Sequence, residues 1–174
     1  MHRQEIRRGL GNFVAITKSR LSGKTFVPNP RHAIYIETSG RCNLACRFCA
    51  YDKLPPRGFM DHKTFSNIVD QACDRGFRQV WLTSMLGEIF ADRQISDKWA
   101  LLEKETRIDG YGFYSNFILA REEQIRSFPT LSKPTSLFIS LYGFDSDSFV
   151  ETTRKLASQY SKLLKKLVLS FGSL

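Results

Sequence analysis

The stretch AIYIETSGRCNLACRFCAY, residues 33–51, joins a short apolar run to three closely spaced cysteines. The residues at its start are largely the β-branched and aromatic types that favour a strand, over residues 33–38. Cys42, Cys46 and Cys49 follow in a loop, separated from one another by three and then two residues. We therefore expect three thiols just beyond the carboxyl end of the first strand.

Beyond this loop, short β-type runs alternate with helical runs, which indicates repeated βα units and a parallel sheet. Further strands are expected at 79–83, 111–115 and 137–141, and residues 167–171 are the candidate for a fifth. Helices are expected at 61–76, around 99–106, at 121–125 and over 149–167. The predicted fold class is α/β, as a partial (β/α) barrel of about four βα units.

The chain has 174 residues, 42% of them hydrophobic, which is enough for one domain with its own core. Residues 1–30 are expected to form a basic N-terminal arm that packs on this core, with an amphipathic helix around Leu10, Phe13, Val14 and Leu21. Residues 31–174 form the predicted partial barrel. Because about 250 residues usually close an eight-stranded barrel, we expect a core that is truncated at its C-terminal end.

The formal net charge of +9 is compatible with an anionic partner, but the basic residues form no continuous block. Nucleic-acid binding is therefore not supported. No apolar run is long enough for a signal peptide or a membrane span, so a cytoplasmic protein without membrane contact is expected.

In a reducing cytosol, clustered cysteines more often bind metal than form disulfides. A structural zinc site would need a fourth ligand, such as His62 or Cys73, although Cys73 falls on the apolar face of a predicted helix. A four-iron cluster held by three thiolates would instead leave one iron open to a substrate or cofactor. The residues alone leave both interpretations open.

The order Cys42-x3-Cys46-x-Phe48-Cys49 resembles the cluster motif of the radical SAM enzymes. The resemblance implies that the three thiolates hold a [4Fe–4S] cluster and that S-adenosylmethionine binds its fourth iron. One electron from the reduced cluster would then cleave S-adenosylmethionine to a 5′-deoxyadenosyl radical that abstracts hydrogen from a substrate. The resemblance also places Phe48 beside the adenine.

Other segments resemble the same family in the same order. TSMLGE, residues 83–88, resembles the GGE loop with leucine at its first glycine, and YSNF, residues 114–117, stands where many members have TNG. ISLYGFD, residues 139–145, resembles an ISLDG strand end, and PPRGFMD, residues 55–61, resembles a stretch of the SPASM/Twitch group. The cofactor-binding residues implied are Phe48, Gly87, Glu88, Ser115, Asn116, Ser140 and Arg154.

The resemblance implies an enzyme acting on an unknown peptide or biosynthetic intermediate, with electrons from a flavodoxin or ferredoxin. A partner chain or second copy is expected to complete the barrel, and with only Cys73 left over no auxiliary cluster is expected. The alternatives are a truncated, non-catalytic remnant that binds cluster and S-adenosylmethionine, and a zinc-binding module.

Overall fold

The computed structural model describes residues 13–14, 16–23, 33–50, 58–83 and 85–171. Four strands and five longer helices make up its core, together with two short 3-10 turns, η2 (Ile89–Ala91) and η3 (Phe128–Thr130). The strands are β1 (Ile34–Ile36), β2 (Gln79–Leu82), β3 (Gly110–Ser115) and β4 (Pro134–Ile139). The helices are α2 (His62–Asp74), α3 (Ile95–Lys104), α4 (Glu122–Ser127), α5 (Ser146–Thr153) and α6 (Ala157–Phe171).

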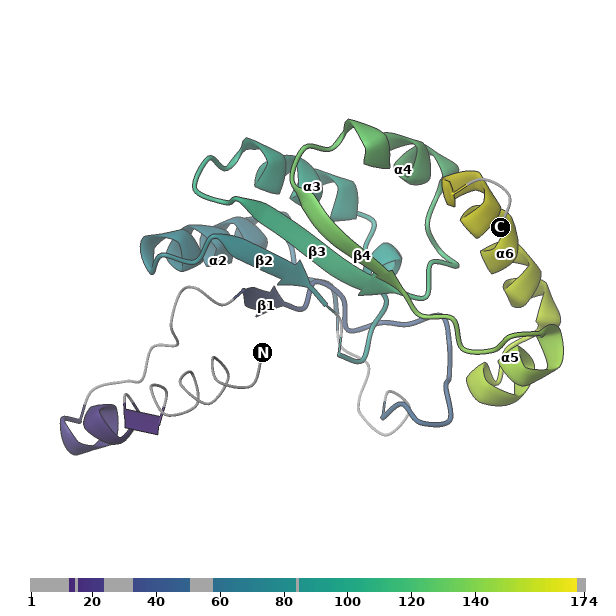
Figure 1. Ribbon diagram of the computed structural model, residues 1–174, viewed down its shortest axis with the longest axis horizontal. Coiled ribbons are helices and arrows are strands. Elements are labelled where there is room, and N and C mark those ends of the chain that lie inside the picture. Colours follow the sequence, from purple (N-terminus) through teal and green to yellow (C-terminus); the bar gives the residue numbers. More distant parts are fainter. Residues whose placement is uncertain (1–12, 15, 24–32, 51–57, 84, 172–174) are drawn as a thin grey trace, which may run out of the picture.

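The strands form one sheet in the order β1-β2-β3-β4, and every neighbouring pair is parallel. Tyr35 pairs with Trp81, Trp81 with Gly112, and Tyr114 with Phe138. The prediction of an α/β partial barrel built from four βα units is confirmed. All four strands end at the same edge of the sheet (Figure 1), so the loops that follow them meet there.

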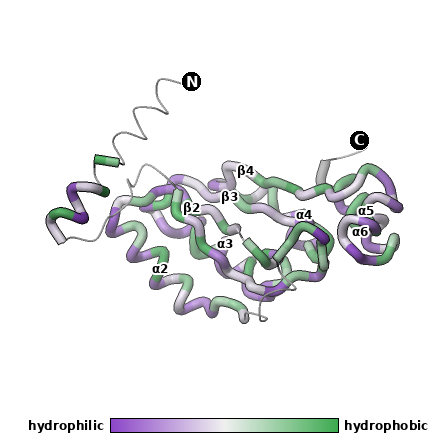
Figure 2. Tube along the Cα trace, turned by 90° about the horizontal axis from the view of Figure 1, so that it is seen from below, coloured by the Kyte–Doolittle hydropathy of each residue, from purple (hydrophilic) through white to green (hydrophobic). Residues whose placement is uncertain are grey.

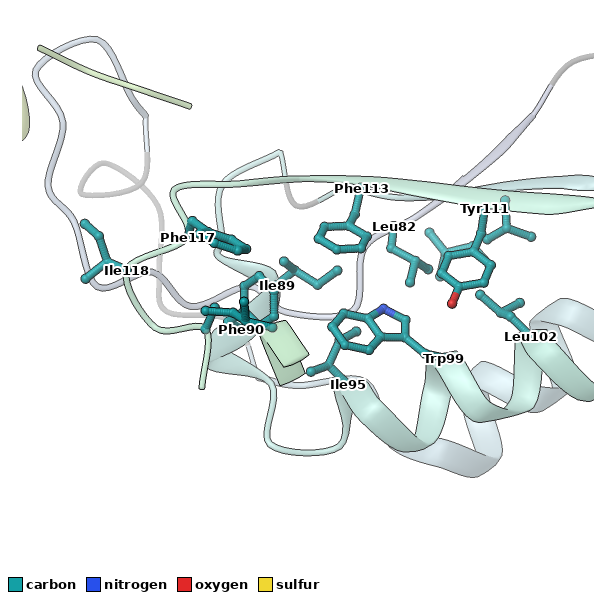
Figure 3. Packing of buried hydrophobic residues seen from close by; sticks show 14 of the residues in the cluster. Leu82, Ile89, Phe90, Ile95, Trp99, Leu102, Tyr111, Phe113, Phe117 and Ile118 are labelled. Carbon is teal, nitrogen blue, oxygen red and sulfur yellow. The ribbon is translucent and has the colours of Figure 1, made fainter. Parts of the chain in front are cut away.

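The hydrophobic core lies between the sheet and the helices α2, α3 and α4, which cover one of its faces (Figure 2). Strand residues such as Leu82, Tyr111 and Phe113 point from the sheet towards Trp99 and Leu102 of α3 (Figure 3). Burying such large side chains supplies most of the driving force for folding. The opposite face of the sheet is exposed at several aromatic residues, including Tyr35, Tyr114 and Phe138.

Local sequence explains how α2 begins and ends. The Asp61 side chain accepts a hydrogen bond from the Thr64 backbone N–H at 2.8 Å and so caps the start of the helix. Gly76 has φ +86° just beyond the helix, in the left-handed conformation that favours glycine. The helix boundary predicted from sequence is confirmed at both ends.

A buried ion pair lies near the start of α3, and a surface ion pair lies just beyond its end. Lys98 and Asp92, both fully or almost fully buried, form a salt bridge, and the Lys98 ammonium also donates to the Met60 carbonyl. On the surface, Arg107 donates two hydrogen bonds to the Glu105 carboxylate. These bonds lower the pKa of Glu105 from its ordinary 4.5 to about 2.

The C-terminal region corrects two predictions. The single helix expected over 149–167 is two helices, α5 and α6, separated at Arg154, which has φ +56°. The fifth strand expected at 167–171 is the end of α6. Its apolar residues continue a helical spacing in which Leu163 and Leu167 are buried, and a short apolar run cannot by itself distinguish a strand from such a helix.

The remaining boundaries differ by a few residues. α3 begins at Ile95, before the expected start near Trp99, and β4 begins at Pro134, before the expected start at Leu137. A proline is tolerated as the first residue of a strand because its missing N–H is not yet needed in the ladder.

Part of the N-terminal arm is helical, over residues 13–14 and 16–21. Phe13, Val14 and Leu21 of this helix are exposed, whereas Leu10 lies outside the described residues. In Figure 1 the helix lies apart from the sheet. Nowhere in the described chain does a helix combine the length and the apolar character needed to cross a bilayer.

Candidate cluster and cofactor site

The cysteine loop lies directly beyond β1, as predicted. All four cysteines of the chain are free thiols; Cys46 is buried, and Cys42 and Cys49 are half-buried. The three thiols lie close together: Cys49 helps to raise the pKa of Cys42, and Cys42 and Cys49 both help to raise that of Cys46. The loop thus concentrates three potential thiolate ligands in one place.

Helix α5 holds this loop through its last carbonyls. The backbone N–H groups of Ala45 and Arg47 donate to the carbonyls of Thr153 and Thr152, at 3.2 and 2.9 Å. Carbonyls at a helix end have no partner within the helix, so the cysteine loop satisfies them. A salt bridge of 2.8 Å between the side chains of Arg47 and Glu151 reinforces the contact.

The loop after β2 is attached to the cysteine loop at Gly87. A Cβ atom at this position would lie 2.0 Å from the Ser39 carbonyl oxygen, so only glycine fits. The next backbone N–H, of Glu88, donates to the Arg41 carbonyl at 2.7 Å. Leu86, which replaces the first glycine of the family motif, has no positive φ. The replacement therefore strains no backbone.

The Glu88 carboxylate is only 2% exposed and serves as a local hydrogen-bond centre. It accepts from the Ser115 hydroxyl, from the Asn116 N–H at 2.8 Å and from the Phe90 N–H at 3.3 Å. Burial raises its pKa, and these hydrogen bonds oppose the shift in part. A cation brought into the site would stabilise the charged form further.

Residues after β3 connect this carboxylate to the cysteines. The Asn116 amide donates to the Asn43 side-chain oxygen at 3.0 Å and lies 3.8 Å from the Cys42 sulfur. Phe117, at the position of the glycine in the family's TNG, keeps a glycine-like φ of +63°. Its ring is fully buried against Phe90, which offsets the backbone strain.

These segments surround one cavity of about 250 Å³ at the carboxyl edge of the sheet. Nine of the ten residues predicted for cluster and cofactor line it. They are Cys42, Cys46, Phe48, Cys49, Gly87, Glu88, Ser115, Asn116 and Ser140. Arg154 does not line it, because it ends α5 and is exposed. Within the quoted motifs, Tyr51, residues 55–57 and Ser84 lie outside the described residues.

Sequence reasoning missed several apolar residues of the cavity wall. Met85, Tyr114 and Tyr142 line the cavity, and the Tyr142 ring lies 5.1 Å from that of Phe48. The signal was available, because each of these residues is next to or near a strand end that was already assigned to the site. A large part of the wall is therefore aromatic or apolar.

The donor set of the cavity fits an iron–sulfur cluster. Burial raises the thiol pKa of Cys42, and burial together with the two neighbouring cysteines raises that of Cys46 to about 11. A bound metal would offset the cost of ionising these buried thiols, because coordination stabilises the thiolate. In addition, the Asn43 amide nitrogen is buried without a hydrogen-bond partner, and a cluster sulfide could accept from it.

A closed zinc site is not assembled among the described residues. His62 lines a separate hollow between α2 and α3, and Cys73 is buried in the core cluster. No three His, Cys, Asp or Glu side chains in the described part of the chain are gathered around one point as ligands of a single ion. In a four-iron cluster, by contrast, each thiolate binds its own iron.

Comparison with known proteins identifies the fold. No family model and no curated protein matches the sequence. Among solved structures, SuiB of Streptococcus suis, bound to S-adenosylmethionine, matches over 75% of this chain and 30% of its own, with 24% identity and a TM-score of 0.61. The anSMEcpe structure with AdoMet and the Kp18Cys peptide matches over 79% and 39%, with 16% identity and a TM-score of 0.61.

A third structure, BtrN in complex with AdoMet and 2-DOIA, matches over 64% of this chain and 46% of its own, with 16% identity and a TM-score of 0.54. These proteins are radical SAM enzymes. The chain therefore has the fold of a partial radical SAM core, and it spans less than half the length of each of the three structures.

Proposed function

We propose that the chain binds a [4Fe–4S] cluster through Cys42, Cys46 and Cys49 and binds S-adenosylmethionine in the adjoining cavity. The observation that carries this proposal is the meeting of three thiols, the Gly87-Glu88 loop and the Ser115-Asn116 turn at one edge of a radical SAM-type sheet. Three thiolates leave one iron of a four-iron cluster without a protein ligand. That iron provides the place for a cofactor.

The remaining residues of the cavity are proposed to orient S-adenosylmethionine. Glu88 supplies a buried negative charge for the amino group, while Gly87 and Asn116 hold the surrounding backbone in place. Phe48 and Ser140 are the proposed contacts on the adenine side and at the end of β4. Arg154 is left out of the proposed set because it lies outside the cavity lining.

When bound and reduced, the cluster would supply the electron that cleaves S-adenosylmethionine to methionine and a 5′-deoxyadenosyl radical, which abstracts hydrogen from a substrate. The protein's own part is to bind, orient and keep water away, for which the apolar wall of Met85 and Tyr142 is suited. A peptide is one substrate class to test, since SuiB has been solved with its precursor peptide SuiA. Flavodoxin or ferredoxin as donor, and a partner chain or second copy beside the sheet, stay predictions.

The test is reconstitution of the full chain with iron and sulfide without oxygen, followed by reduction and addition of S-adenosylmethionine. We expect about four irons per chain, an electron-spin signal that S-adenosylmethionine perturbs, and 5′-deoxyadenosine as product. Replacing Cys42, Cys46 or Cys49 with alanine should abolish the cluster. The matched control, Cys73→Ala, should retain it because Cys73 lies in the core.

Other outcomes separate the alternatives. A perturbed spin signal without 5′-deoxyadenosine would favour a non-catalytic remnant that binds both cofactors. Tight zinc binding with no reconstitutable cluster, or cluster loss in the Cys73→Ala control alone, would contradict the proposal.

A further inference from the structure

Four aromatic residues form a continuous stripe on the face of the sheet that the helices leave uncovered. Tyr35, Trp81, Tyr114 and Phe138, here called the aromatic plate, come from β1, β2, β3 and β4 in turn. The strand register places all four on the same face, because Tyr35 pairs with Trp81 and Tyr114 with Phe138. Tyr35 is 66% exposed, Tyr114 45% and Phe138 47%. The plate thus offers a large flat apolar surface.

The rings of the plate support one another. Tyr114 and Phe138 stack with centroids 4.8 Å apart and planes within 13°. Trp81 lies 5.5 Å from Tyr114, 5.7 Å from Phe138 and 6.4 Å from Tyr35. Each distance is within the range in which aromatic pairs attract. The plate is therefore a preorganised surface rather than a set of separate exposed rings.

Glycine in β3 makes room for the largest ring. A Cβ atom on Gly112 would lie 2.9 Å from the Trp81 indole and 2.7 Å from the Ser136 carbonyl oxygen. Trp81 can lie flat over the strand only because this side chain is missing. A closed barrel interior is usually filled by branched aliphatic side chains. The flat aromatic lining of this face differs from that pattern.

The plate reaches the proposed cofactor cavity. Tyr114 belongs to both, since it also lines the cavity with Met85 and Tyr142. Within the four described strands, the residues that share the plate's face include no charged side chain. Glu37, just after β1, accepts a hydrogen bond from the Leu86 N–H at 3.4 Å. An anionic group placed on the plate would lose water without gaining a counterion there.

We propose that the aromatic plate binds the substrate and that this substrate presents an uncharged aromatic ring, such as an aromatic side chain, to Tyr114 and Phe138. The inference rests on the proposed function, because it places that ring beside the cavity in which S-adenosylmethionine would bind. An aromatic ligand buries much apolar area and loses little conformational entropy when it stacks. The plate is accordingly a specificity determinant, selecting flat apolar groups over aliphatic or anionic ones.

The test is a titration of the full chain, labelled with nitrogen-15 on its two tryptophans, with N-acetyl-L-phenylalaninamide. The indole signal of Trp81 should shift saturably, while that of Trp99, which is 2% exposed in the core, should not. N-acetyl-L-leucinamide should bind at least about threefold more weakly, as expected for loss of an aromatic pair. Trp81→Phe assigns the two signals.

Variants locate the binding surface. Tyr114→Leu and Phe138→Leu should each weaken binding of the probe roughly two- to tenfold, the fold-change that corresponds to one aromatic pair. Phe144→Leu is the matched control, because Phe144 is 96% exposed and lies outside the plate. It should leave binding unchanged. Circular dichroism of each variant checks that the fold is retained.

Three results would overturn the inference. The first is that the Trp81 signal shows no saturable shift, and the second is that the leucine and phenylalanine amides bind with equal affinity. The third is that the Trp81 signal broadens as the protein concentration rises, which would show that a second copy covers the plate. The titration requires neither cluster nor S-adenosylmethionine. Its failure is therefore distinguishable from failure of the cluster and cleavage experiment, and the reverse also holds.

Discussion

Replacing Gly87 with alanine should separate the two loops that build the cavity. The added Cβ atom would lie 2.0 Å from the Ser39 carbonyl oxygen and 3.1 Å from the Arg41 nitrogen, both of them backbone atoms that no rotamer change can move. Ordinary contact begins near 3.4 Å, so the loops must part by about 1.4 Å (3.4 minus 2.0). Such a shift would break the 2.7 Å hydrogen bond from the Glu88 N–H to the Arg41 carbonyl.

The expected cost of Gly87→Ala is about 2–4 kcal/mol in the free energy of unfolding, from overpacking and one lost backbone hydrogen bond. Because the cysteine loop begins at Arg41, the iron content after reconstitution should also fall, to roughly half of wild type or less, as expected for ligands displaced by more than 1 Å. Urea denaturation and iron analysis measure the two effects.

Gly58→Ala provides a matched control for this prediction. Its added Cβ atom would meet nothing within 4 Å, and Gly58 has no positive φ. The hydrogen bond from the Gly40 N–H to the carbonyl of residue 58, at 3.0 Å, would be retained in the variant. We expect stability and iron content close to wild type. The reasoning is refuted if Gly87→Ala matches wild type in both measurements, or if Gly58→Ala is equally damaging.

Three further predictions test the fold around the site. Arg107 lowers the pKa of Glu105 to about 2, so the stability that the Glu105 carboxylate contributes is complete above about pH 5 and is lost as the pH falls towards 2. The urea midpoints of wild type and Glu105→Gln should therefore converge over that range. A difference that stays constant with pH would contradict the prediction. Lys98→Met should lower the free energy of unfolding by about 3–5 kcal/mol, because it leaves the Asp92 carboxylate charged and buried. The double variant Lys98→Met/Asp92→Asn should recover much of this loss in the same denaturation assay. An equal loss in the single and the double variant would contradict a stabilising buried pair. Arg154→Gly should raise the free energy of unfolding by about 1 kcal/mol, because glycine relieves the left-handed backbone strain; the control Lys155→Gly should not. S-adenosylmethionine should still perturb the spin signal of the Arg154→Gly variant. A loss of stability in Arg154→Gly would contradict the strain argument.

The parts of the fold that follow from local patterns could be predicted well. β1 was located from its strand-type residues and α2 from the helical run over 61–76, and both signals act over a few neighbouring residues. The end of α5 could not be located in this way. Arg154 is a good helix former, and the break there coincides with carbonyls of Thr152 and Thr153 that bond to a loop a hundred residues earlier in the chain.

In the candidate site, too, some features follow from local sequence and others depend on the tertiary structure. The cysteines, Gly87, Glu88 and Asn116 each stand in a motif of fixed spacing after a strand, so their meeting follows from the parallel order of the sheet. Arg154 was placed by analogy with a continuous helix and lies outside the cavity lining. Tyr114 and Tyr142 stand beside strand ends already assigned to the site, and only the structure shows that their side chains line the cavity.

The sequence by itself determined which chemical groups come together: three closely spaced thiols, an acidic residue after a glycine, and strands that end where these residues begin. These features are readable because ligand type and strand pattern depend on residue identity and short spacing. Only the tertiary structure decided that Glu88 is buried among three donors, that Gly87 lies against Ser39, and that four rings from four strands form one surface. Such relations depend on the register and packing of segments distant in the chain, which no local pattern encodes.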